Sequence, residues 1–160
     1  MINQTHKWTS CTTYANLYEK HSTGSITMRA FTPFYTPYQM LEIGVFDGGY
    51  FNSSPEDVLE DVVIAPTNFY ASNVGLSRQR WIEKDWITHE DPLGWFQWYI
   101  RYHHGRRIET LDKWQIGRWS SFGARHGAQV RKSGLGNTTK RPRQRQGLLH
   151  WAHNPEPDVQ

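Results

Sequence analysis

The chain has 160 residues, of which 37% are hydrophobic and 14% aromatic, and its formal net charge is +3 at pH 7. This length fits one domain that buries roughly two thirds of the surface exposed by the unfolded chain. A single cysteine, Cys11, excludes an internal disulfide framework. Neither a signal-peptide segment nor an apolar run near ~18 residues is found, so we expect a soluble intracellular protein, either cytoplasmic or in the nucleoid or nucleus.

The modest net charge conceals two regions of opposite sign. Residues 1–100 contain six Lys or Arg and eleven Asp or Glu, whereas residues 101–150 contain twelve Lys or Arg and two acids, Glu109 and Asp112. Nine of the twelve are arginines, whose planar guanidinium suits paired hydrogen bonds to phosphate or to a guanine edge. This pattern favours a polyanionic partner.

Residues 1–28 are polar and weakly periodic, and we predict that they form an N-terminal arm. Residues 29–155 are predicted to form one globular helical domain, and residues 156–160 a short tail. Eight Trp, eight Tyr and seven Phe predict that the core of the domain is aromatic.

The first predicted helices begin where Ser or Thr precedes Pro, because the hydroxyl can cap the helix and Pro suits the first turn. Thr36 and Pro37 open a short helix that ends at Gly44, with Gln39 at the spacing of a capping box. A second short helix is predicted over residues 54–63. The segment GVFDGGYF, residues 44–51, is predicted to be a glycine-rich loop or a short extended piece.

Ser77 is predicted to cap a short helix through Lys84. The clearest helix follows Asp91, to which we assign a capping role, and it carries aromatic residues at i, i+3, i+4 and i+7. These are Trp95, Trp98, Tyr99 and Tyr102. The opposite side of the helix carries Gln97, Arg101 and His104.

The next helix is predicted over residues 110–132, with Leu111, Ile116, Trp119 and Phe122 in the core. Three glycines in this segment, at 117, 123 and 127, predict a weakened helix and leave room for a break. A basic loop over 133–141 leads to a last helix that begins at Pro142. The fold class is therefore mainly α: a compact single domain of several short helices and three longer C-terminal helices, with little or no β.

Several motifs resemble a family of small, uncharacterised Trp- and Arg-rich proteins. They are GVFDGGYF, NFYASNVGLSRQRWIEKDWI, DPLGWFQWYIRYHHGRR, RHGAQVRK and RPRQRQGLLHWAHNP, and they cover roughly residues 31–155. The resemblance implies no activity, cofactor or site residue. The chain departs from the family pattern at Asp47 and His150, which are weaker candidates for chemistry for that reason.

The basic segment is interpreted as a nucleic-acid-binding face, for DNA or RNA, rather than a merely solvated surface, because its cations are spread over three helices with almost no acids between them. The predicted contact residues are Arg101, Arg106, Arg107, Arg118, Arg125, His126, Gln129, Arg131, Lys132, Arg141, Arg143 and Arg145. Tyr102, Trp114 and Trp151 are predicted to stack on unpaired bases, although aromatic residues at helical spacing more often belong to a core.

Candidates for catalysis are few. Glu42, just before the glycine-rich loop, and His104 are the predicted catalytic pair, with Arg101 holding an anion. They permit either a nucleic-acid-processing or base-modifying enzyme, or an enzyme acting on a nucleotide or another phosphorylated substrate in a Trp-lined pocket with Arg118. A scaffold for an acidic protein is a third reading. No metal site or cofactor is expected, since the histidines do not have the spacing of convergent ligands.

Overall fold

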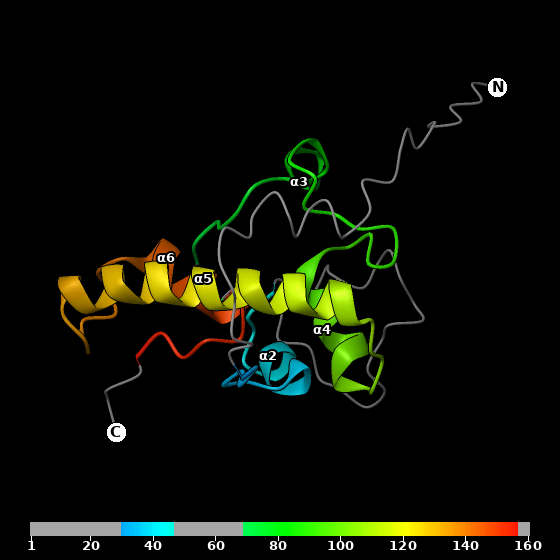
Figure 1. The fold of residues 1–160 in the computed structure, drawn as a ribbon. Helices are drawn as coiled ribbons and strands as arrows, with labels where there is room; N and C mark the ends of the chain where they lie inside the picture. The colour runs from blue at the N-terminus through cyan, green and yellow to red at the C-terminus, as the bar shows by residue number, and fades with distance from the viewer. Residues whose placement is uncertain (1–29, 47–68, 157–160) are drawn as a thin grey trace.

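In the computed structural model, residues 30–46 and 69–156 are described, and within them the chain forms five helices and no strand (Figure 1). The helices are α2 (Pro37–Glu42), α3 (Arg78–Glu83), α4 (Trp95–His103), α5 (Glu109–Ser133) and α6 (Pro142–His150). The prediction of a compact, mainly α-helical fold with three longer helices towards the C-terminus is confirmed. The predicted arm, the helix over 54–63, the rest of the glycine-rich loop and the last tail residues lie outside the described residues.

Two of the predicted helix caps are found in the structure. At the start of α2 the Thr36 hydroxyl accepts a hydrogen bond from the Gln39 N–H at 3.2 Å, and the Gln39 side chain accepts from the Thr36 N–H at 2.9 Å. At the start of α3 the Ser77 hydroxyl accepts from the Arg80 N–H at 3.4 Å. These local patterns satisfy backbone donors that a helix leaves free, and they fix where each short helix begins.

The start of α4 differs from the prediction. Gly94, with φ of 95°, occupies the N-cap, and no side chain caps the helix. A residue with a Cβ is disfavoured at this φ, which is why glycine suits this position. The capping role assigned to Asp91 is therefore wrong, because Asp91 lies in the turn before the helix and its side chain has other partners.

The long helix has no break at its glycines, since α5 runs without interruption from Glu109 to Ser133. Gly123 is used for close packing: a Cβ there would lie 2.3 Å from Cε1 of His153, whose ring stacks on Trp119 at 4.6 Å. The second half of α5 packs along α6, so tertiary contacts outweigh the low helix propensity of glycine.

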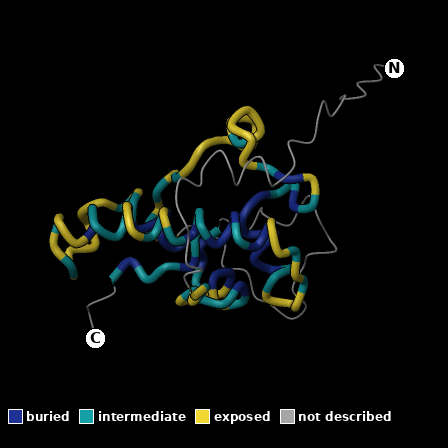
Figure 2. The backbone as a smooth tube through the Cα atoms, viewed as in Figure 1, coloured by how far each residue is buried: buried dark blue, intermediate teal, exposed yellow. Residues whose placement is uncertain are grey.

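The core is aromatic, as predicted. The ring of Phe31, from the segment before α2, makes edge contacts with four rings at centroid distances of 5.0 to 5.5 Å. These are Trp98, Tyr99 and Tyr102 of α4 and Trp119 of α5. Figure 2 shows that buried backbone is concentrated where α2, α4 and α5 meet, whereas α3 and the far end of the α5–α6 hairpin are exposed.

The segment around α2 is joined to the end of α6 by hydrogen bonds. The carbonyl of Val45 accepts from Gln146 Nε2 at 2.7 Å and from His150 Nε2 at 3.1 Å, and the Phe34 N–H donates to the carbonyl of Ala152 at 2.8 Å. Gln146 is completely buried. These hydrogen bonds hold the N-terminal and C-terminal parts of the described chain together on one side of the core.

Candidate functional site

Six cations are exposed at the end of the hairpin formed by α5 and α6, and we call them the basic surface. They are Arg125, Arg131, Lys132, Lys140, Arg141 and Arg143. The first three lie on the second half of α5, and the last three lie in the loop and the first turn of α6. All of them except Lys140 are predicted contact residues, and the α5–α6 hairpin brings them to one end of the domain.

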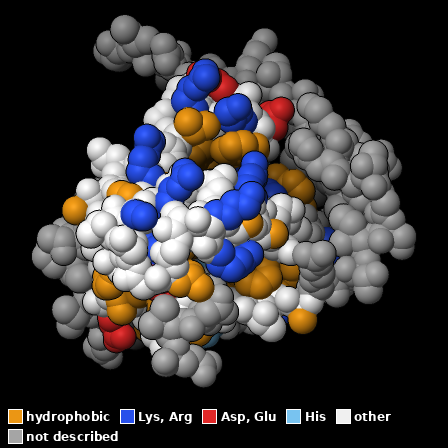
Figure 3. All heavy atoms as spheres, turned by 90° about the vertical axis from the view of Figure 1, so that its left-hand side faces the viewer, with side chains coloured by type: hydrophobic (Ala, Val, Ile, Leu, Met, Phe, Trp, Pro, Cys, Tyr) orange, Lys and Arg blue, Asp and Glu red, His pale blue; other side chains and the backbone are white. Residues whose placement is uncertain are grey.

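No acid interrupts this part of the chain, since residues 113–155 contain nine Lys or Arg and neither Asp nor Glu. Figure 3 views the molecule from the hairpin end and shows Lys and Arg side chains gathered on that face, with hydrophobic side chains between them and acids at the margins. The cations repel one another, and a bound anion relieves this repulsion, so such a surface attracts anions.

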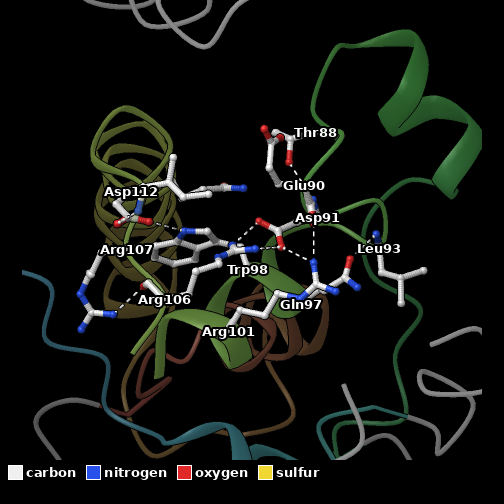
Figure 4. A network of polar contacts seen from close by, with 12 residues as sticks. Thr88, Glu90, Asp91, Leu93, Gln97, Trp98, Arg101, Arg106, Arg107 and Asp112 are labelled. Atoms are coloured by element: carbon white, nitrogen blue, oxygen red, sulfur yellow. Dashed lines mark hydrogen bonds and ion pairs between the residues drawn. The ribbon is translucent and has the colours of Figure 1, made fainter. Parts of the chain in front are cut away.

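Arg101 and Arg106, by contrast, bind inside the fold. The Asp91 side chain is completely buried, and both of its oxygens accept from Arg106, at 2.8 Å from Nη1 and 2.6 Å from Nη2 (Figure 4). Arg101 Nη1 donates to the same carboxylate at 3.2 Å and to the carbonyl of Glu90. This cluster holds the turn before α4 against the chain that follows α4, so its arginines are committed to structure.

Arg145 is the clearest correction to the predicted contact residues. Its side chain is completely buried. Nε donates to the carbonyl of Lys140 at 2.8 Å, Nη2 donates to the carbonyl of Asn137 at 3.1 Å, and the guanidinium forms an ion pair with Glu156. Arg145 therefore holds the loop between α5 and α6 and presents no charge to a partner.

Arg118 lies among tryptophans. Its guanidinium carbon is 4.6 Å from the ring centre of Trp114, 5.3 Å from that of Trp151 and 5.6 Å from that of Trp86. Nη1 also donates to Gln115 Oε1 at 3.1 Å. Burial lowers the pKa of Arg118 to about 10, so the group remains a cation at neutral pH.

Each ring predicted to stack on a base is buried or contacts another side chain of the protein. Trp114 is only 6% exposed, so its predicted role is wrong. Tyr102 is covered by Arg107, whose guanidinium carbon lies 3.6 Å from the ring centre, and Trp151 stacks on Phe122 at 5.0 Å. Arg107 is exposed but lies before α5, at the opposite end of that helix from the basic surface.

The predicted catalytic residues do not form a site. Glu42 is exposed at the end of α2, and within the described residues no hydrogen bond or ion pair joins it to Arg101 or His104. His104 Nε2 lies 3.2 Å from the hydroxyl of Tyr38 instead, while Arg101 is directed to the turn at Asp91. The polar side of α4 is thus divided among separate structural contacts.

Two predicted contact residues, His126 and Gln129, are half-buried beside the basic surface. The ring of His126 lies 4.1 Å from that of Phe122. Burial, followed by the positive charge of Arg125, lowers the pKa of His126, which favours the neutral imidazole at pH 7.

The sequence did not predict the positions of two side chains, Gln146 and Trp86. Gln146 looked like one of several polar residues in RPRQRQ, although its position near the buried Leu149 was a signal that it faces the core. Trp86 lies after α3 and outside any helical apolar stripe, and its side chain is 38% exposed. A tryptophan without a helical partner in sequence was the signal for that exposure.

In the described part of the chain, no three His, Cys, Asp or Glu side chains lie close enough together to hold a metal ion. A helix with the length and apolar character needed to cross a bilayer is likewise not found there. Comparison of the chain with protein-family models, with curated proteins and with solved structures finds no match. The resemblance to Trp- and Arg-rich proteins therefore stays a prediction.

Proposed function

We propose that this protein binds nucleic acid through the basic surface, with contacts mainly to phosphates. The observation that carries the proposal is the exposure of six cations at one end of the domain, in a stretch from residue 113 to 155 that contains no acid. Cations in the last turn of α5 balance the partial negative charge of that helix end, which supports a local structure able to keep them together. Phosphate contacts position a protein without reading sequence, so we expect little sequence selectivity.

A salt titration tests the proposal. Affinity for a fluorescein-labelled 20-nucleotide single strand and for a duplex of the same length is measured by anisotropy at several KCl concentrations. If the six cations each neutralise one phosphate, the slope of log affinity against log salt is about −4 for the single strand and about −5 for the duplex. Affinity at low salt no greater than that of an unrelated protein with the same charge would contradict the proposal.

Paired variants separate a local surface from general charge. Replacing Arg125 and Lys132 with Gln removes two cations of the basic surface, and we expect weaker binding and a slope that is flatter by about 1 to 2. Replacing Arg107 and Lys113 with Gln removes two cations near the other end of α5 and is expected to change the slope much less. Equal effects of the two variants would mean that the basic surface is not the binding site.

A further inference from the structure

We infer that Trp86 is a stacking platform for an unpaired base, and that the nucleic acid is therefore single-stranded where it crosses α5. This inference rests on the proposed function and specifies the substrate class of the same site. It starts from an unusual side chain, because Trp86 is 38% exposed although tryptophan is among the most strongly buried residues on average.

The Trp86 side chain does not attach α3 to the rest of the domain. No residue of that helix is buried, and it is Trp81 whose ring lies near Gly75 and Gly94. The backbone of Trp86 is fixed, since its N–H donates to the carbonyl of Trp81 at 2.9 Å and its carbonyl accepts from Arg118 Nη1 at 3.3 Å. A fixed backbone with an exposed ring suits contact with a planar ligand.

Charge around the ring favours a nucleotide as that ligand. Lys84 Nζ is 5.5 Å and the Arg118 guanidinium carbon 5.6 Å from the ring centre, near the ~6 Å limit of a cation–π contact. By contrast, Arg107 lies directly over Tyr102, at 3.6 Å. Both cations lie over the Trp86 ring, but at a greater distance than Arg107 over Tyr102, so positive charge that can bind phosphates lies next to a ring that is still partly exposed.

A line of cations connects Trp86 to the basic surface. The half-buried Arg118 and the exposed Arg125 and Lys132 are seven residues apart on α5, which places them on one side of the helix about 10 Å from each other along its axis. A strand whose base stacks on Trp86 can therefore follow this line to the hairpin end. A base in a duplex has both faces covered by its neighbours, so only an unpaired base can use the ring in this way.

The test compares two strands of equal charge, a 16-nucleotide oligothymidylate and an abasic strand of the same length, in anisotropy titrations at low salt. The wild type is expected to bind the thymidylate roughly 5- to 100-fold more tightly, the range that base–aromatic stacking supplies. Trp86→Leu, which keeps an apolar side chain without a ring, is expected to remove this preference, and Trp86→Phe to retain most of it. Thermal melts verify that each variant is folded.

Ile82→Ala is the matched control, because Ile82 is also 38% exposed and lies on α3, four residues before Trp86. We expect it to bind both strands as the wild type does. Equal loss in Trp86→Leu and Ile82→Ala would overturn stacking and indicate an apolar docking surface for a protein. A wild type that binds both strands equally well would overturn the inference alone, whereas a wild type that binds neither would refute the proposed function as well.

Discussion

Arg143 and Arg145 belong to the same short motif on α6, and replacing each with Gln should have opposite effects. Arg143 is exposed and belongs to the basic surface, whereas Arg145 is completely buried. We expect Arg143→Gln to weaken nucleic-acid binding and leave stability unchanged. We expect Arg145→Gln to lower stability and leave binding per folded molecule unchanged.

The size of the stability effect follows from the partners of Arg145. Removing one member of a buried ion pair costs about 3–5 kcal/mol, because the remaining charge stays without its partner. Glu156 is 18% exposed on its side chain and can be partly hydrated after the change, so we expect the lower end, about 3 kcal/mol. Unfolding free energies of single domains are about 5–15 kcal/mol, so this is a large fraction of the total. The corresponding fall in melting temperature is about 6–12 °C.

The assay combines thermal and urea denaturation of both variants with oligonucleotide titrations well below the lower melting temperature. For Arg143→Gln the unfolding free energy should stay within about 0.5 kcal/mol of the wild type, and the salt slope for a single strand should flatten by about 0.7. If Arg145→Gln melted like the wild type and bound as weakly as Arg143→Gln, the structural role of Arg145 would be refuted.

Three further predictions concern the interior. Asp91→Asn should cost about 2–4 kcal/mol in urea denaturation, since it leaves the guanidinium of Arg106 without its counter-charge; an unchanged midpoint would contradict the buried ion pair. Trp98→Ala should cost about 3–5 kcal/mol by removing a ring that is 0% exposed, and a wild-type melting curve would show that this ring is not part of the core. Burial lowers the pKa of His153, so the unfolded chain binds a proton more readily than the folded chain. The contribution of His153 to stability is therefore fully present above about pH 6.5 and is lost as the pH falls below that value. In thermal melts His153→Gln should lose less stability at low pH than the wild type, and an equal pH dependence would exclude His153 as the cause.

Local signals in the sequence predicted much of the helical structure. The capping box of Thr36 and Gln39 and the cap at Ser77 depend on residues only three positions apart, so the sequence alone contains the whole interaction. The glycines of α5 do not weaken the helix visibly, because the difference in helix propensity is small beside the free energy of packing. The close approach of His153 to Gly123 depends on residues 30 positions apart, which no local pattern contains.

The sequence predicted that arginines and lysines form the candidate site, but not which of them are exposed. Arg143 and Arg145 look alike in RPRQRQ, yet two positions on a helix correspond to about 200°, so they point to opposite sides. Arg145 lies three residues before the buried Leu148, which was a usable signal that it faces inward. Asp91 could not be assigned in this way, since a carboxylate before a helix suits a cap as well as an ion pair. Only the return of the chain after α4 brings Arg106 to it.

The hydrogen bonds between Val45 and α6 have a consequence for how the protein folds. They join residues 101 and 105 positions apart, although helical proteins typically fold fast because most of their contacts are local. On the ribosome, the residues of α2 are synthesised early and can contact α4 before α6 exists, but the hydrogen bonds from α6 to Val45 can form only after α6 has been synthesised. We therefore expect this part of the core to close last during translation, and refolding of the complete chain to be slower than its helical content alone would indicate.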